Sequence, residues 1–485
     1  MFDTIIIGRD FCSLIAALVA SHRGLKTLLV TEGNQEAEYR DAGYTFPIDP
    51  IPLSGFGCEQ PVLRLFGELH LPVTEAPKML LVDPAFQVIL PDHRIDLFND
   101  TNRMITDMIR EFPLQEREIR RVYHAVSKAT TLVKRWMEED CTDRPDHLTK
   151  IFRYAARLPA SIAGVYSLAF RENGMDHAFK RVIEAQIAVL SHLDVDRRFL
   201  PLSAAYLLSR PSGGLFYPLG GRNAWMNWLR KEYVASGGEF LEGCSVMRID
   251  TKPGIIVDIE CNESSSTLHS KTLIVSTHWE KLNLLLFHQK AFRKDVRRLG
   301  SNRISAYPFS LHLGVHQEGL PGNMAPYVAV VLDDKVPARH RNLVFIERSL
   351  QGETDRAPEG KRALSATVFL KDSPLVLDDA ELMGIAKTII DAIEGFLPFL
   401  RESIDYVNIE KSIIFARQSQ ESVNQKYYAR KRSIIAMNIL SPETSVPNVL
   451  LTGGLLRAGL GFEGEVFSGM DAALLAGKEL RSHGQ

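Results

Sequence analysis

The sequence lacks several features that would narrow its function at once. Its apolar stretches fall short of the ~18–20 residues needed to span a bilayer, and no basic and apolar leader resembling a signal peptide precedes the first expected strand. Positive and negative charges nearly balance, with 57 Lys plus Arg against 59 Asp plus Glu, so electrostatics gives no support for nucleic-acid binding. These absences predict a cytoplasmic protein and leave peripheral contact with a membrane open.

Cysteine is also scarce and scattered. The five copies are Cys12, Cys58, Cys141, Cys244 and Cys261, without a C-x-x-C pair or a zinc-ligand spacing. An odd number of dispersed cysteines is typical of reduced thiols in the cytoplasm. The 14 histidines form no H-E-x-x-H pattern, and no catalytic serine elbow is present. The sequence therefore predicts reduced cysteines and no metal site, and it identifies no catalytic residue.

The N-terminal stretch has the order of a dinucleotide-binding βαβ unit. Residues 4–8 are continuously apolar, as in a buried parallel strand, and residues 11–23 carry apolar side chains at helical spacing. "KTLLVTE" then forms a second strand that ends at Glu32. Such a unit needs G-x-G-x-x-G at its first turn and an acid ~20 residues later that holds a ribose. Gly8 and Glu32 satisfy the first and last of these requirements.

The rest of the turn argues against a bound dinucleotide. The second glycine of the motif lets the pyrophosphate approach the backbone, but Asp10 fills that position. Two like unit charges ~4 Å apart repel by about 4 kcal/mol at an effective dielectric of 20. Asp10 also has a role without a cofactor, because a carboxylate at a helix N-terminus caps free N–H groups. Ser13 at the third glycine position is a milder change, and Arg9 offers a guanidinium that would offset Asp10 or reach the phosphates.

Five further stretches, taken in order, carry a resemblance to a known family. They are "AGYTFPIDPIP" (42–52), "GGLFYPLGGRNAWMNWL" (213–229), "ISAYPFSLHLGV" (304–315), "DRAPEGKRALSATVFL" (355–370) and "NVLLTGGLLRAGLGFEGEVFSGMDAA" (448–473). Together they resemble the phytoene desaturase branch of the FAD-dependent amine oxidase superfamily, and the second stretch is the most specific. The resemblance implies an α/β fold with a discontinuous, Rossmann-like FAD-binding domain and an inserted helical and antiparallel-sheet substrate domain.

The domain boundaries follow from this layout. We expect residues 1–98, 213–280 and 431–485 to build the FAD-binding-like domain. Residues 99–212 would form a helical substrate or lid region, and residues 281–430 a substrate domain with an antiparallel sheet.

The resemblance also implies a cofactor and its contacts. FAD would remove a hydride from a hydrophobic small molecule, with the protein placing the flavin. By matching position, Gly8, Arg9 and Ser13 belong to the pyrophosphate turn, Glu32 would hold the ribose, and the backbone of Val246 would contact adenine. The glycines of the closing segment would lie along the flavin: Gly453 and Gly454 beside the ribityl chain, and Gly459, Gly461 and Gly464 beside the isoalloxazine.

The closing segment repeats the acidic substitution of the first turn. The final helix begins near Gly464, with Glu463 and Glu465 on either side, and Glu463 stands where the related family has proline. That helix end would face the part of the flavin where negative charge develops on reduction. Acids there fit capping of their own helix better than flavin stabilisation, although Arg457 in the same loop would offset Glu463. FAD is therefore in doubt because of Asp10, Glu463 and Glu465.

Two functions of different classes remain open. The first is an FAD-dependent, desaturase-like oxidoreductase acting on a hydrophobic small molecule. The second is a flavin-free protein that keeps the fold as a lipid- or protein-binding scaffold, since this fold also serves as a chaperone for prenylated small GTPases. Phe216 and Tyr217 in the most specific stretch either line a substrate pocket or belong to the core, and core aromatics are the commoner case.

Overall fold

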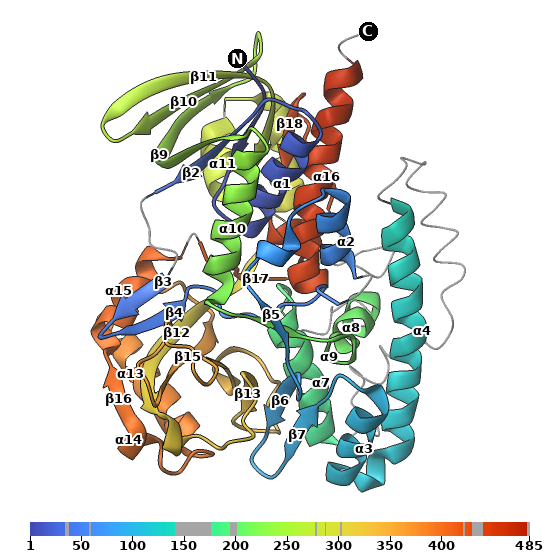
Figure 1. The fold of residues 1–485 in the computed structure, drawn as a ribbon, viewed down its shortest axis with the longest axis vertical. Coiled ribbons are helices and arrows are strands. Elements are labelled where there is room, and N and C mark those ends of the chain that lie inside the picture. The colour runs from blue at the N-terminus through green and yellow to red at the C-terminus, as the bar shows by residue number, and fades with distance from the viewer. Residues whose placement is uncertain are drawn as a thin grey trace.

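The computed structural model of the chain describes residues 1–33, 38–57, 60–140, 176–194, 201–276, 279–286, 288–300, 303–420, 422–428 and 440–482. Two large sheets organise these residues. Figure 1 shows them at opposite ends of an elongated molecule, with both chain termini at the end of the smaller sheet. The space between the two sheets is where the site discussed below lies.

The smaller, six-stranded sheet has the order β1-β2-β9-β10-β11-β18, and β1 also pairs with β11. Its strands are β1 (Phe2–Ile7), β2 (Thr27–Glu32), β9 (Glu239–Asp250), β10 (Ile255–Cys261), β11 (Ser264–Val275) and β18 (Val449–Leu451). Strands β2, β1, β11 and β18 pair in parallel, whereas β9, β10 and β11 form an antiparallel meander. Three separate regions of the chain supply this sheet, which confirms the predicted discontinuous α/β domain.

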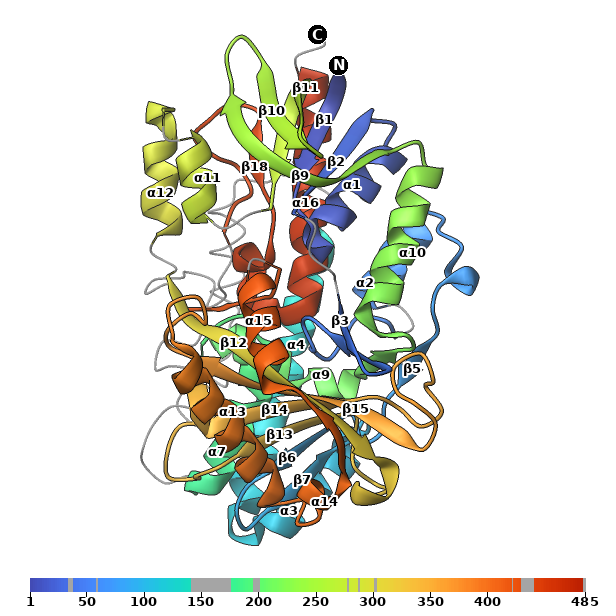
Figure 2. The same ribbon diagram turned by 90° about the vertical axis from the view of Figure 1, so that its left-hand side faces the viewer.

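Helices cover both faces of the six-stranded sheet, as its apolar strands require. They are α1 (Phe11–His22), α10 (Gly221–Ala235), α11 (Trp279–Leu286), α12 (Arg293–Leu299) and α16 (Gly461–Ser482). Side chains alternate along β1, so Ile6 packs in the cluster that contains α1 and α16, while Ile5 and Ile7 pack with α11 and α12. Figure 2 shows α1 and α10 on one side of this sheet and α11 and α12 on the other.

The larger, eight-stranded sheet has the order β16-β12-β15-β14-β13-β6-β7, with β17 paired to β12. Its strands are β6 (Phe86–Ile89), β7 (Arg94–Leu97), β12 (Ile304–His316), β13 (Tyr327–Val331), β14 (Leu343–Arg348), β15 (Lys361–Leu370), β16 (Ile404–Val407) and β17 (Lys426–Tyr427). Its pairings are antiparallel except for β13 with β6. Strands β6 and β7 fall within the expected segment 1–98, so that segment contributes to both sheets.

The remaining elements surround the two sheets. The helices are α2 (Pro61–Glu68), α3 (Thr101–Glu111), α4 (Glu116–Asp140), α7 (His177–Leu190), α8 (Pro201–Leu208), α9 (Arg210–Gly213), α13 (Asp379–Glu394), α14 (Leu400–Ser403) and α15 (Ile409–Gln418). The short strands are β3 (Glu38–Asp41) with β4 (Tyr44–Pro47), and β5 (Met79–Leu81) with β8 (Phe216–Pro218). The 3₁₀ turns are η1 (Val73–Glu75), η2 (Pro113–Gln115), η3 (Lys290–Phe292), η4 (Gln317–Gly319), η5 (His340–Asn342) and η6 (Gly454–Leu460).

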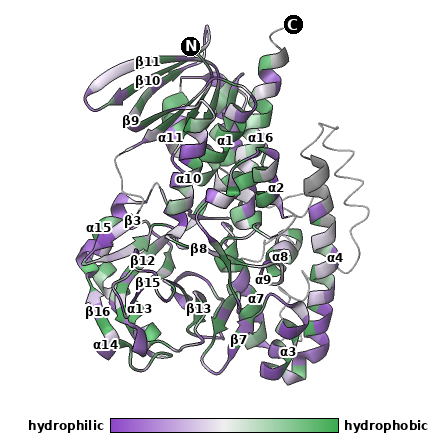
Figure 3. Ribbon diagram, viewed as in Figure 1, coloured by the Kyte–Doolittle hydropathy of each residue, from purple (hydrophilic) through white to green (hydrophobic). Residues whose placement is uncertain are grey.

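Hydropathy separates the buried helices from the outer ones. Figure 3 shows α1 mainly in the hydrophobic colour and α3 mainly in the hydrophilic colour, in agreement with the almost complete burial of α1. In the part of the chain that the structure describes, no helix combines the length and apolar character needed to cross a membrane. The apolar stretch "RLPASIAGVYSLAF" (157–170), within the expected helical region 99–212, lies outside the described residues.

The cysteines depart from the expected reduced state. Cys244 and Cys261 form a disulfide between β9 and β10, so the prediction of reduced thiols is wrong for this pair. The cause is tertiary: the hairpin places two residues 17 positions apart directly opposite each other. Cys12 is a free, buried thiol, while Cys58 and Cys141 lie outside the described residues.

Candidate functional site

The first turn keeps the shape of a dinucleotide-binding turn around Gly8. Gly8 has φ +154°, and a Cβ there would lie 2.8 Å from Ser276 Cβ and 2.9 Å from Ser13 Cβ. Asp10 caps α1 as predicted, because its Oδ1 accepts a hydrogen bond of 2.8 Å from the Ser13 N–H. The Ser13 hydroxyl in turn donates to the Asp10 carbonyl. The Ser13 N–H at the start of α1 is thus satisfied by a side chain of the protein itself.

The Asp10 carboxylate also joins the turn to two distant segments. The Ser276 hydroxyl, just after β11, donates to Asp10 Oδ2, and a Cβ at Gly453 would lie 3.9 Å from the same oxygen. Burial raises the pKa of Asp10, while the hydrogen bonds from Ser276 and Ser13 act to lower it. A carboxylate therefore lies between the first turn and the closing glycine segment, where the resemblance expects the pyrophosphate.

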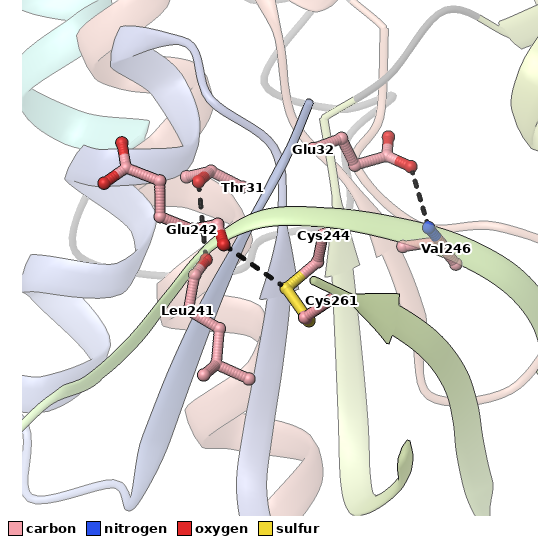
Figure 4. Close-up of a disulfide and its surroundings, with 7 residues drawn as sticks. All are labelled: Thr31, Glu32, Leu241, Glu242, Cys244, Val246 and Cys261. Carbon is pink, nitrogen blue, oxygen red and sulfur yellow. Dashed lines mark hydrogen bonds between the residues drawn. A yellow bond between two sulfur atoms is a disulfide. The ribbon is translucent and has the colours of Figure 1, made fainter. Parts of the chain in front are cut away.

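Glu32, the expected ribose ligand, already has partners within the chain. Its Oε1 accepts a hydrogen bond of 3.2 Å from the Val246 N–H, drawn in Figure 4, and lies 2.8 Å from Lys281 Nζ. Arg9 covers the same strand end, where its Nη1 donates to the Glu32 carbonyl at 3.2 Å. The resemblance assigns Glu32 to a ribose and the Val246 backbone to adenine; in the structure these two residues contact each other.

Glu463 forms a buried ion pair at the start of α16. Its side chain has no exposed surface and lies 2.8 Å from Arg210 Nη1, and the Tyr206 hydroxyl donates to it. Arg210 also stacks over the Tyr206 ring at 4.1 Å. The predicted capping of α16 by this acid is wrong, because its carboxylate binds side chains of α8 and α9. Arg457, the proposed neutraliser of Glu463, pairs with Asp471 at 2.8 Å instead.

Glu465 is the centre of a second buried network. Its carboxylate lies 2.9 Å from His192 Nε2 and 2.5 Å from Arg222 Nη2, and it accepts a 3.0 Å bond from Asn424. Burial alone would raise the pKa of Glu465, but Arg222 and His192 outweigh that effect and hold the pKa below its usual value. As for Glu463, the partners are distant side chains, and the capping interpretation is wrong.

Asp49 extends this network towards the space between the sheets. Arg222 Nη1 lies 3.3 Å from Asp49 Oδ2, and Asn424 donates to the same oxygen at 2.7 Å. Burial and the neighbouring Glu465 raise the pKa of Asp49, against the effect of Arg222. Arg222 therefore holds two carboxylates whose pKa values are shifted in opposite directions.

The later glycines of the closing segment pack against protein atoms. Added Cβ atoms would lie 2.8 Å from Asn424 Oδ1 at Gly454, 2.4 Å from Ser203 Oγ at Gly459, 2.0 Å from the Leu190 carbonyl at Gly461, and 2.3 Å from the Arg457 carbonyl at Gly464. Gly461 also has φ +58°. Contacts within the protein therefore explain why glycine occupies these positions, without any contact to a flavin.

A wide cleft opens beside the first turn. Its volume is about 620 Å³, within the range of small-molecule sites. Four arginines and four acids are among its lining residues: Arg9, Arg40, Arg222, Arg230, Asp10, Glu38, Asp49 and Glu242. The cleft is therefore polar and close to neutral.

A much smaller cavity lies on the other side of Asp49. It has a volume of about 40 Å³ and includes His192, His312, Asn424 and Lys426 in its lining. Lys426 Nζ donates to the Ala188 carbonyl at 2.6 Å, and burial lowers the pKa of this lysine to about 8. The cavity borders the residues that hold Glu465, at the end of α16 where the resemblance expects the flavin ring.

The aromatic pair of the most specific stretch lies in the core. Phe216 and Tyr217 are buried in β8. The Tyr217 hydroxyl donates to Glu353 at 2.7 Å and accepts from Arg356. Neither residue lines the cleft or the small cavity, which favours the core interpretation.

Comparison with known proteins agrees with this architecture. No protein-family model matches the chain. The chloroplast prolycopene isomerase of Daucus carota is 23% identical over 464 residues, covering 88% of this chain and 71% of the carrot protein. The chain spans 56% of two prolycopene isomerases from an Oncidium hybrid.

Solved structures give the same fold at lower identity. Cyclohexylamine oxidase from Brevibacterium oxydans aligns over 99% of both chains, with a TM-score of 0.58 and 12% identity. Rab GDI from Plasmodium falciparum aligns over 99% of this chain and 98% of its own, with a TM-score of 0.55 and 13% identity. The sequence relatives and the shared fold support the resemblance to the FAD-dependent amine oxidase and phytoene desaturase-like superfamily.

The superfamily's cofactor does not fit the described residues in the pose that the resemblance implies. The Asp10 carboxylate lies where the pyrophosphate would lie, and it accepts hydrogen bonds from Ser13 and Ser276. Glu32 is held by Val246 and Lys281. The cavity beside α16 holds about 40 Å³, well below the ~300 Å³ of the smallest common ligand pockets. The chain therefore has the fold of these flavoproteins. Asp10, the contacts of Glu32 and the small cavity each oppose FAD binding in the expected position.

The residues that interrupt this path were mostly missed by the sequence analysis. Ser276, His192, Arg210, Arg222 and Asn424 come from segments far apart in the chain and have no motif. The one available signal was the acid itself, since a buried acid in an apolar segment needs a cation or hydrogen-bond donors.

Proposed function

We propose that this chain is a flavin-free binding protein built on a flavoenzyme fold, and that its ligand enters the cleft between α10 and the first turn. The observation that carries the proposal is the Asp10 carboxylate, held by Ser13 and Ser276 beside Gly453. A phosphate brought to that position would meet a negative charge at close range and would lose the Ser13 N–H and the Ser276 hydroxyl, which already donate to Asp10.

The lining of the cleft supports a polar ligand over a lipid. Its arginines and acids are equal in number, so a ligand that carries both charges, or a polar segment of a partner protein, fits better than a hydrocarbon. A hydrophobic substrate belongs to the second candidate below.

The second candidate is an FAD-dependent oxidoreductase or isomerase. It is favoured by the sequence relation to prolycopene isomerase across 88% of the chain. In that case bound FAD would supply hydride transfer, and Arg9 or Arg222 would have to leave their present partners to contact it. This candidate requires a rearrangement of Asp10 on binding.

Titration with FAD distinguishes the two candidates. We expect no uptake by the wild type and a gain in FAD affinity of at most roughly a thousandfold in Asp10→Asn, since this change removes repulsion of about 4 kcal/mol and leaves the contacts of Glu32 and the small cavity unchanged. Asparagine also caps helices well, so Asp10→Asn should fold like the wild type and the two FAD affinities can be compared. Flavin fluorescence quenching would give both affinities.

A matched control is available at another helix. Asp100 caps α3 in the same way, with its Oδ1 accepting 2.7 Å from the Arg103 N–H, and it does not line the cleft. Asp100→Asn should leave FAD uptake at the wild-type level. Tight, stoichiometric FAD binding by the wild type would refute the proposal and support the second candidate.

A further inference from the structure

The disulfide lies where β9 changes partners. The first half of β9 pairs with β2, ending with Cys244 opposite Glu32. The second half pairs with β10, beginning with Cys244 opposite Cys261. Figure 4 shows the bond beside Glu32 and Val246. One residue therefore belongs to two ladders, and the disulfide fixes it at their junction.

The two cysteine residues differ in exposure. Cys244 is fully buried, whereas Cys261 is partly exposed. Cys261 is the last residue of β10 and is followed by the turn residues Asn262 and Glu263, both exposed and both with positive φ. A thiol from solution can therefore approach the bond from the Cys261 side.

The junction is connected to the cleft by short contacts. The Gly33 N–H donates to the Cys244 carbonyl at 3.0 Å, and the Val246 N–H donates to Glu32 at 3.2 Å. Both Gly33 and Glu242, two residues before Cys244, are part of the cleft lining. Increased backbone motion at Cys244 would therefore extend to Gly33 and Glu242 in the wall of the cleft.

We propose that Cys244–Cys261 is a site of thiol–disulfide exchange with a dithiol reductant, and that its reduction loosens the wall of the cleft formed by Gly33 and Glu242. This inference does not depend on whether the cleft holds FAD or another ligand.

The exchange balances in two steps. A thiolate of the reductant attacks Cys261 Sγ, forms a mixed disulfide, and releases Cys244 Sγ as a thiolate that takes up a proton. The second thiol of the reductant then attacks the reductant's own sulfur in the mixed disulfide and releases Cys261 Sγ as a thiolate, which takes up a proton. The protein gains two electrons and two protons, and the dithiol becomes a disulfide.

Thiol counting and hydrogen exchange test the proposal on the full-length protein. Dithiothreitol, applied to the folded protein, should raise the number of titratable thiols by two. Exchange with a glutathione-type monothiol should add its adduct to Cys261, as read by peptide mass spectrometry. Reduction should speed amide exchange at Gly33 and Val246 several-fold and leave β12 amides unchanged.

Cys12→Ala is the matched control, because it removes a buried thiol of the same domain and leaves the pair intact. It should show the same increase of two thiols and the same change in exchange. An unchanged thiol count under native reduction would overturn the proposal, and so would full reduction without faster exchange at Gly33 and Val246.

Discussion

The buried ion pair between Glu463 and Arg210 gives a prediction whose size follows from burial. The two side chains are 0% and 4% exposed and their charged atoms are 2.8 Å apart. Replacing Glu463 by Gln leaves the Arg210 guanidinium buried without its counter-charge. Breaking a buried pair from one side costs about 3–5 kcal/mol, so we expect Glu463→Gln to lower the free energy of unfolding by that amount.

Urea unfolding followed by tryptophan fluorescence would measure this loss. Trp225 is a suitable reporter, because it contacts Phe56, which stacks on Phe462 next to Glu463. A control is the exposed pair of Arg401 with Glu394, at 2.5 Å with 53% and 33% exposure. Glu394→Gln should cost at most about 1 kcal/mol.

The double replacement Glu463→Leu with Arg210→Met separates charge from packing. Removing both partners leaves no uncompensated charge, so the double variant should be more stable than Glu463→Gln. If Glu463→Gln costs no more than the exposed control, the buried-charge argument for this end of α16 is refuted.

Three further predictions follow from other contacts. Arg222 and His192 hold the folded-state pKa of Glu465 below its ordinary value of 4.5, so its contribution to stability is present above pH 4.5 and is lost as the pH falls through the lower folded pKa. The unfolding free energy of Glu465→Gln, measured against pH, should therefore fall less steeply in acid than that of the wild type. Tyr217→Phe leaves Glu353 without the 2.7 Å hydroxyl donor and should cost about 1–3 kcal/mol in urea unfolding, and a cost near zero would mean that Glu353 finds another donor. Cys261→Ser opens a loop whose ends are 17 residues apart and should cost about 3 kcal/mol by the chain-entropy model, whereas equal stability with and without reductant in the wild type would contradict this.

The sequence predicts the architecture well because local patterns dictate it. The apolar run of β1, the helical spacing of α1 and the position of Glu32 are each set within a few residues, and the structure confirms them. Asp10 as a helix cap is similarly local, since its partner is the N–H three residues later.

The site could not be predicted to the same extent because its partners are remote. Glu463 and Glu465 were interpreted as caps of their own helix, but they bind Arg210, Arg222 and His192. The sequence separations of these pairs exceed 240 residues, at 253, 243 and 273, and no spacing rule spans such distances. The disulfide between Cys244 and Cys261 was missed for a related reason, because strand register decides which cysteines face each other.

The flavin content of the purified protein shows whether Asp10 excludes the cofactor. The visible spectrum should be recorded first, and the supernatant of the denatured protein then assayed for released FAD. The arrangement of Asp10 with Ser13 and Ser276 predicts a colourless protein that takes up no added FAD. About one FAD per chain would refute the flavin-free proposal, and would mean that Asp10 leaves Ser276 to admit the pyrophosphate.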